Sequence, residues 1–78
     1  EALFEQLRLL RKKLADQQAV PAYIILSDKV LHLISTIRPT SIEAFGEING
    51  IGEFKKEKYG KEFVGIIKAF IEKQSDLI

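Results

Sequence analysis

Apolar residues recur at helical spacing through most of the chain, and this pattern predicts an all-α fold. The first run consists of Leu3, Leu7, Leu10 and Leu14. Residues at this spacing lie on one face of an α-helix, and nothing interrupts the pattern before Pro21. The sequence therefore predicts a first helix over residues 3–18. On this helix Arg8 and Lys12 share a flank away from the apolar face, and Leu9 lies nearly opposite that face.

A proline ends this first helix. Pro21 fixes its own φ and disfavours a helical conformation at the residue before it, so the chain must turn. Residues 23–26 are apolar like a strand, but no second strand-like segment exists to pair with them, and a single helical turn is predicted instead. Ser27 then caps another helix, which ends before Pro39. The apolar face of that helix carries Val30, Leu31, Ile34 and Ile37.

The second half of the chain predicts three more helices. Residues 40–43 read Thr-Ser-Ile-Glu, a capping box in which Thr40 is the N-cap of a short helix through Ile48. The segment 49–52, Asn-Gly-Ile-Gly, favours a tight turn. A helix over 53–59 would end at Gly60 as its C′ residue, and a last helix would span 61–74. The predicted fold is a compact five-helix orthogonal bundle with a short extra helical turn near residues 22–26.

Eight residues on the apolar faces of these helices are predicted to form one core. They are Leu7, Leu10, Leu14, Leu31, Ile34, Ile66, Ile67 and Phe70. The aromatic residues are expected to be mostly structural: Tyr59 is assigned to the packing, and the phenylalanines largely fall at core spacing. An exposed stacking platform made of phenylalanines is therefore not expected.

Composition limits the class of protein. The 78 residues are 46% apolar and 29% charged and include no cysteine, so we expect residues 1–78 to form a single domain without disulfides. Twelve basic against eleven acidic residues give a net charge of +1, which does not by itself indicate a nucleic-acid-binding protein. No apolar stretch approaches the about 20 residues of a membrane span. The chain begins at Glu1 and lacks a secretory signal, so we expect a fragment of a larger cytosolic protein.

Most catalytic and metal-binding chemistry is excluded. A structural zinc site needs three or four thiolate or imidazole ligands, and the chain has one imidazole, His32. His32 falls on the polar side of its helix with no partner placed by spacing, so we expect it to be exposed and to have no catalytic role. The two closely spaced glycines match neither a Rossmann fingerprint, since Lys55 occupies the third glycine position, nor a P-loop.

The glycine turn supports a different hypothesis. A helix, the turn at Gly50, Ile51 and Gly52, and a second helix form a helix-hairpin-helix-like arrangement, whose backbone amides would hold a DNA phosphate. Four lysines and two glutamates between residues 51 and 61 leave a local excess of two positive charges. The alternative is that the glycines only permit a sharp turn while Ile48 and Ile51 enter the core. Both interpretations remain open from the residues alone.

Tyr23 is a second candidate for contact with nucleic acid. It is an aromatic residue beside the Pro21 turn, where its ring would stack on an unpaired base. The alternative is a core tyrosine with only its hydroxyl at the surface, which its apolar neighbours also favour. Spacing on the first helix additionally allows ordinary surface ion pairs for Glu5 with Arg8 and for Asp16 with Lys12 or Lys13.

Several motifs in order resemble the HRDC domain, the helicase-and-RNase-D C-terminal module, over nearly all of residues 3–73. They are the run LFEQLRLLRKKLA, the turn VPAY, the helix start PTS, and the turn INGIG followed by KKEKYG. The first run together with VPAY looks most like bacterial RecQ-type DNA helicases.

This resemblance implies an accessory domain without catalytic activity that binds single-stranded or branched DNA weakly and tunes substrate choice in DNA repair and recombination. It maps DNA contact onto Tyr23, and basic contacts onto Arg8, Lys12, Lys55, Lys56 and Lys58. It implies no cofactor or metal in the domain itself, and ATP with magnesium in the motor of a parent 3′–5′ helicase. We further expect a monomer in the bacterial cytoplasm, associated with the nucleoid.

Two alternatives to this function stay open. The domain could instead be a protein-docking module that contacts the helicase core or another protein and binds little DNA. The parent could also be an RNase D-type ribonuclease, because HRDC domains occur there too.

Overall fold

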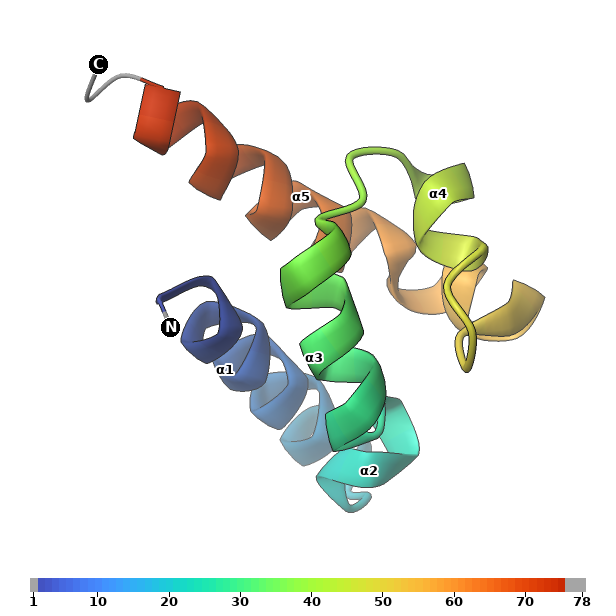
Figure 1. Cartoon of the computed structure of the whole chain (residues 1–78). Helices are drawn as coiled ribbons and strands as arrows, with labels where there is room; N and C mark the ends of the chain where they lie inside the picture. The colour runs from blue at the N-terminus through green and yellow to red at the C-terminus, as the bar shows by residue number, and fades with distance from the viewer. Residues whose placement is uncertain (1, 76–78) are drawn as a thin grey trace.

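The computed structural model describes residues 2–75, which form five α-helices joined by short connections (Figure 1). The helices are α1 (Ala2–Gln18), α2 (Ala22–Ile25), α3 (Asp28–Ile37), α4 (Ile42–Gly46) and α5 (Gly52–Ser75). None of these described residues lies in a strand. The all-α fold class predicted from the sequence is confirmed, and the helical turn expected near residues 22–26 is α2.

The helices pack in two connected groups. α1 contacts α2, α3 and α5, whereas α4 packs against α5. In the view of Figure 1, α3 lies between α1 and α4, and α5 extends behind it along the length of the molecule. The long helix α5 therefore joins the α4 side of the fold to α1.

One core receives apolar side chains from all five helices. Its fully buried large side chains are Leu3, Leu7, Ile25, Leu26, Leu31, Ile34, Phe45, Phe63 and Ile67. Of the eight predicted core residues, six are buried, while Ile66 and Phe70 are half-buried and pack against the core from its edge. Where α4 meets α5, the rings of Phe45 and Phe63 stack with their centroids 5.9 Å apart.

Gly60 does not end a helix, contrary to the prediction. α5 continues through it without interruption, so the two helices expected over 53–59 and 61–74 are one. Gly60 is buried, and a Cβ built on it would lie 3.2 Å from Ile42 Cγ2 and 3.5 Å from Phe45 Cδ2. The glycine is thus placed where α4 approaches the α5 backbone closely, and it serves packing instead of helix termination.

The helix caps are partly as predicted. Ser27 caps α3 through its Oγ, which accepts a hydrogen bond from the Val30 amide at 3.2 Å. The cap of α4 is Ser41 and not Thr40: the Ser41 Oγ accepts from the Ala44 amide at 3.1 Å, and α4 ends at Gly46 rather than at Ile48. The Thr-Ser pair offers two adjacent caps, and the extended backbone at Ser41 (φ −136°, ψ 157°) selects the second.

Two apolar side chains that were expected at core positions lie at the surface instead. Ile37, assigned to the apolar face of α3, is 57% exposed because it occupies the last position of that helix, before Arg38 turns the chain in a left-handed conformation. Phe54 is 70% exposed, although the phenylalanines were expected mostly at core positions. Leu9 is exposed as predicted.

Candidate nucleic-acid interface

The short helix α2 presents its aromatic residue to solvent. Tyr23 is 67% exposed, which excludes the alternative of a core tyrosine with only its hydroxyl at the surface. The apolar neighbours that favoured burial divide between two sides: Ile25 and Leu26 are fully buried, and Ile24 is about half exposed. The buried pair therefore anchors α2 in the core and leaves the ring of Tyr23 accessible.

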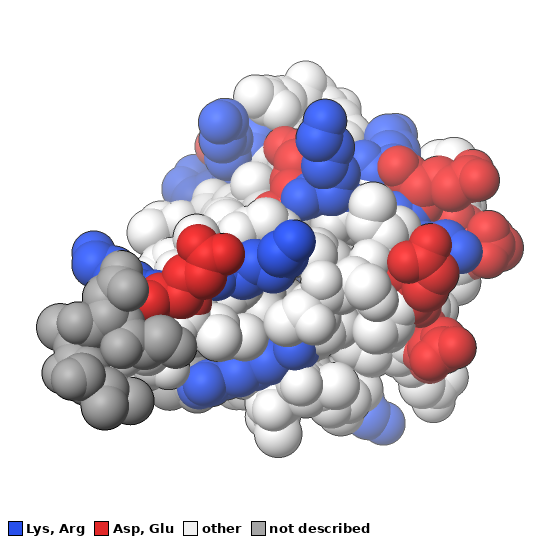
Figure 2. Space-filling view, turned by 90° about the horizontal axis from the view of Figure 1, so that it is seen from above, with Lys and Arg blue, Asp and Glu red and all other residues white. Residues whose placement is uncertain are grey.

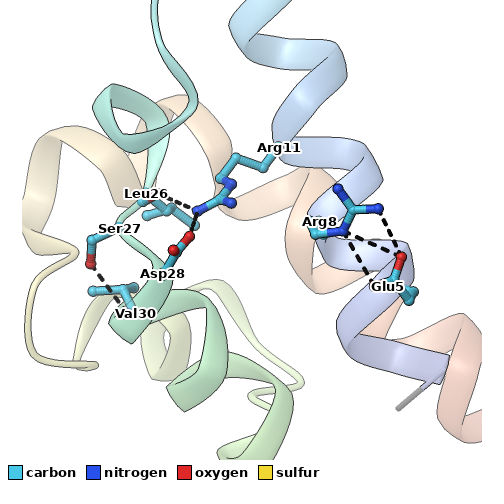
Figure 3. A network of polar contacts seen from close by, with 7 residues as sticks. All are labelled: Glu5, Arg8, Arg11, Leu26, Ser27, Asp28 and Val30. Atoms are coloured by element: carbon cyan, nitrogen blue, oxygen red, sulfur yellow. Dashed lines mark hydrogen bonds and ion pairs between the residues drawn. The ribbon is translucent and has the colours of Figure 1, made fainter.

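Arg11 fixes the junction between α2 and α3. From α1 its Nη1 donates to the Leu26 carbonyl at 3.0 Å and to Asp28 Oδ1 at 2.8 Å (Figure 3). Leu26 is the C-cap of α2 and Asp28 opens α3, so one guanidinium holds the end of one helix and the start of the next. Arg11 is only 8% exposed. Hydrogen bonds to a charged donor in a buried place are among the stronger ones, so this contact contributes to the fixed position of α2.

The glycine turn has the backbone that the sequence predicted. Gly50 (φ 102°) and Gly52 (φ 69°) both adopt left-handed conformations that favour glycine. Ile48 and Ile51 on either side are buried, as the packing interpretation required. A Cβ at Gly50 would also lie 2.6 Å from Val30 Cγ2, so this turn needs glycine for space as well as for conformation. Packing thus accounts for the turn, and phosphate binding by its amides remains a hypothesis.

Contacts on both sides of α2 bring it to the end of the molecule that carries the glycine turn. Before α2, Gln18 Oε1 accepts hydrogen bonds from Tyr59 Oη at 3.1 Å and from Lys58 Nζ at 3.4 Å, both on α5. After α2, Val30 in the first turn of α3 lies against Gly50. In Figure 1, α2 lies at the bottom of the view and the loop before α5 lies at its right side, with the lower part of α3 between them. The segments on either side of α2 thus contact the turn and the first turns of α5. The surface that carries Tyr23, the turn and the first turns of α5 is here called the α2–turn end.

The predicted lysines of α5 lie in this region but in different environments. Lys58 is exposed, and its Nζ lies 5.4 Å from the ring centroid of Phe54 and 5.6 Å from that of Tyr59. Lys55 is half-buried. Lys56 is paired with Glu53 at 3.2 Å, and its aliphatic stem covers Gly46 so closely that a Cβ there would be 2.3 Å from Lys56 Cδ. Lys56 therefore has a structural role that the sequence did not indicate.

Arg8 and Lys12 lie on the flank of α1, each beside an acid. Arg8 Nη2 is 2.9 Å from Glu5 Oε1, and Lys12 Nζ is 3.1 Å from Asp16 Oδ2, which confirms the predicted surface pairs. The hydrogen bond lowers the pKa of Glu5 and raises the pKa of Arg8. Figure 3 shows Arg8 turned along α1 towards Glu5 while Arg11 points to the α2–α3 junction. No described contact links Arg8 or Lys12 to Tyr23, and their role in DNA binding stays a prediction.

The surface charge is mixed. In the view of Figure 2, basic side chains are scattered over the face and acidic side chains gather mainly towards its right side, so no single basic patch forms. This distribution agrees with the net charge of +1. Any attraction to nucleic acid must therefore come from a few local cations and not from a field over the whole face.

Neither a metal-binding cluster nor a membrane-spanning helix is found among residues 2–75. His32 is exposed as expected, and its ring stacks on Phe4 with the centroids 4.3 Å apart. Within residues 2–75, no group of three or more histidine, cysteine or acidic residues is arranged to hold a metal ion. None of the described helices is long and apolar enough to cross a membrane.

Comparison with known proteins gives one family. The model of the HRDC domain family matches residues 1–67. The ATP-dependent DNA helicase RecQ of Bacillus subtilis is 39% identical over 70 residues, which cover 90% of this chain and 12% of that protein. RecQ of Haemophilus influenzae is 39% identical over 66 residues, covering 85% of this chain and 11% of the relative. The ATP-dependent DNA helicase UvrD2 of Mycobacterium bovis is 37% identical over 68 residues, covering 87% of this chain and 10% of that protein.

The chain spans only about a tenth of the length of these curated relatives. No solved structure gives a significant match. The family model covers most of the chain, and the relatives agree with the resemblance found in the order of its motifs. The chain belongs to the HRDC domain family.

Proposed function

We propose that this chain is a non-catalytic accessory domain of a RecQ-type ATP-dependent DNA helicase, where it binds single-stranded or branched DNA weakly and tunes substrate choice in DNA repair and recombination. The observation that carries this proposal is Tyr23, 67% exposed on a helix that Arg11 anchors at the α2–turn end. An aromatic ring held in a fixed, solvent-facing position is suited to stack on an unpaired base. The nearby Lys55 and Lys58 would neutralise phosphates of the same strand.

Relatives support this choice of parent protein. Those compared above are named as ATP-dependent DNA helicases, which favours a helicase parent over an RNase D-type ribonuclease. ATP and magnesium would then bind in a motor outside this chain, and the domain itself would need no cofactor. We propose that the domain acts as a monomer in the bacterial cytoplasm, near the nucleoid where its DNA substrates are.

Neutralising two lysines tests the proposal. In Lys55→Gln with Lys58→Gln, the slope of log affinity for single-stranded DNA against log salt concentration should become shallower by about 1.4. Each lost phosphate contact accounts for about 0.7 of this slope. Fluorescence anisotropy with a labelled oligothymidylate at several salt concentrations measures this slope. We retain Lys56 in the variant because its stem packs on Gly46.

The matched control removes the same charge from the other end of the same helix. In Lys68→Gln with Lys73→Gln, two exposed lysines of α5 are neutralised. Lys73 lies about 22 Å along the helix axis from Lys58, given a rise of about 1.5 Å per residue. The slope of this control should stay that of the unmodified chain. Equal slopes for both double variants would contradict a phosphate site at the α2–turn end.

A protein-docking function is the second candidate. It is favoured by the exposed apolar side chains of Leu9 on α1 and Ile37 on α3, at 56% and 57%. Contacts of this kind are apolar, so the affinity for a helicase core or another partner would change little with salt. Absence of DNA binding, together with salt-insensitive binding to the parent motor, would favour this candidate.

A further inference from the structure

Phe54 is the most exposed large apolar residue among those described, at 70%. A single exposed hydrophobic side chain is ordinary and carries no conclusion alone. Its position is more informative. Phe54 lies in the first turn of α5, two residues after Gly52, and therefore at the α2–turn end that also presents Tyr23.

A cation is held beside the Phe54 ring. Lys58, one helical turn later, has its Nζ 5.4 Å from the ring centroid, and the same Nζ donates a hydrogen bond to Gln18 Oε1 at 3.4 Å. The ammonium is thus kept near the aromatic ring by a contact to α1. With the ring still 70% exposed, most of its surface remains open to a ligand. An open aromatic ring next to a positioned positive charge is the combination with which proteins bind single-stranded nucleic acid.

The chain segment around Phe54 carries a small local excess of positive charge. The segment from Glu53 to Lys61 contains four lysines and two glutamates, an excess of two positive charges. Glu53 is paired with Lys56 at 3.2 Å, and Glu57 is exposed on the next turn. These acids moderate the attraction, which is consistent with weak binding.

We propose that Phe54 is a second base-stacking residue, which binds an unpaired base of the same DNA strand that contacts Tyr23. This inference rests on the proposed function and extends it to a residue to which the family resemblance assigned no DNA contact. The base stacks on the open part of the ring, and Lys58 lies beside the adjoining phosphate. Stacking does not discriminate strongly between bases, so no base preference is expected from this position.

Two substitutions at this position separate base stacking from a general effect of hydrophobicity. Phe54→Leu keeps an apolar side chain but removes the ring, and it should weaken binding to oligothymidylate by about tenfold, within the range found for loss of a base-stacking aromatic residue. Phe54→Tyr keeps the ring and should bind like the unmodified chain. For an abasic oligomer of the same length, Phe54→Leu and the unmodified chain should bind equally, since phosphate contacts are retained.

Phe54→Trp supplies a direct readout. The chain contains no tryptophan, so this substitution creates a single indole whose fluorescence can be followed on its own. Stacking on a base should quench it on addition of oligothymidylate but not on addition of the abasic oligomer. Leu9→Trp, at an exposed position of α1, is the matched control and should not be quenched.

The outcomes distinguish this inference from the proposed function. If Phe54→Leu binds oligothymidylate normally while Tyr23→Ala and the Lys55 and Lys58 variant weaken it, Phe54 does not stack and the proposed function stands. If the unmodified chain binds no single-stranded DNA, both fail together. Because Phe54 is exposed, each variant should melt within a few degrees of the unmodified chain. A large loss of thermal stability in Phe54→Leu would make the residue structural and overturn the inference.

Discussion

Replacing Ile67 by alanine is expected to lower the free energy of unfolding by about 2 to 5 kcal/mol. Ile67 is fully buried in the middle of α5, where the helices share one core. The substitution removes three carbon atoms and leaves a cavity that the surrounding side chains can fill only in part. A domain of this size has a total stability of about 5 to 10 kcal/mol, so the loss is a large part of the whole.

Urea denaturation followed by circular dichroism measures this change. The matched control is Leu9→Ala, which removes a similar side chain from a position that is 56% exposed, and it should change stability by no more than about 0.5 kcal/mol. If both variants unfolded at the same urea concentration, the assignment of the buried face of α5 would be wrong.

Replacing Tyr23 by alanine is expected to weaken binding to single-stranded DNA by about tenfold, equivalent to about 1.4 kcal/mol. The residue is 67% exposed, so little packing is lost with its ring. Binding to a blunt duplex, which offers no unpaired base, should be largely unaffected. Anisotropy titrations with both kinds of DNA, beside a thermal melt, separate these effects.

Tyr23→Phe is the conservative control. It keeps the aromatic ring and removes only the hydroxyl, so it should retain most of the single-strand affinity if stacking is the main contact. A melting temperature far below that of the unmodified chain, with DNA affinity intact in Tyr23→Ala, would show that Tyr23 serves the fold and not the ligand.

Local pattern was sufficient to predict most of the fold but not the length of its last helix. The apolar spacing of α1 and α3 and the Pro21 turn lie within short segments, so the sequence indicates them directly. Gly60 resembled a helix end because glycine is common at that position. Its actual role depends on Ile42 and Phe45 from α4, a contact between segments that are distant in sequence.

Because a helix end was assumed at Gly60, the exposure of Phe54 at the surface was not predicted. In one continuous helix, Phe54 is nine residues before the buried Phe63, and nine residues at about 100° each place the two on opposite faces. The exposed position of Phe54 therefore follows from the pattern once α5 is treated as a single helix. The angle between two residues can be calculated from their spacing only within one continuous helix. The prediction placed Phe54 and Phe63 on two separate helices, so it could not use this relation.

Arg11 was missed for a related reason. No role was predicted for Arg11, although it lies four residues after Leu7 and so continues the apolar face. The position indicates burial, but the acceptors, the Leu26 carbonyl and Asp28, come from another part of the chain. Tyr23 and the α5 lysines were identified by local motifs, whereas their proximity depends on contacts through Gln18 and Val30.

The most direct test of the central claim is a salt titration of the unmodified chain with a short oligothymidylate. If Lys55 and Lys58 each neutralise a phosphate, the logarithm of affinity should fall with the logarithm of salt concentration with a slope of about −1.4 or steeper. Between about 50 and 200 mM salt the affinity would then decrease by about sevenfold. An affinity that stays constant over this range, or no binding at the lowest salt, would contradict a DNA-binding function for the α2–turn end.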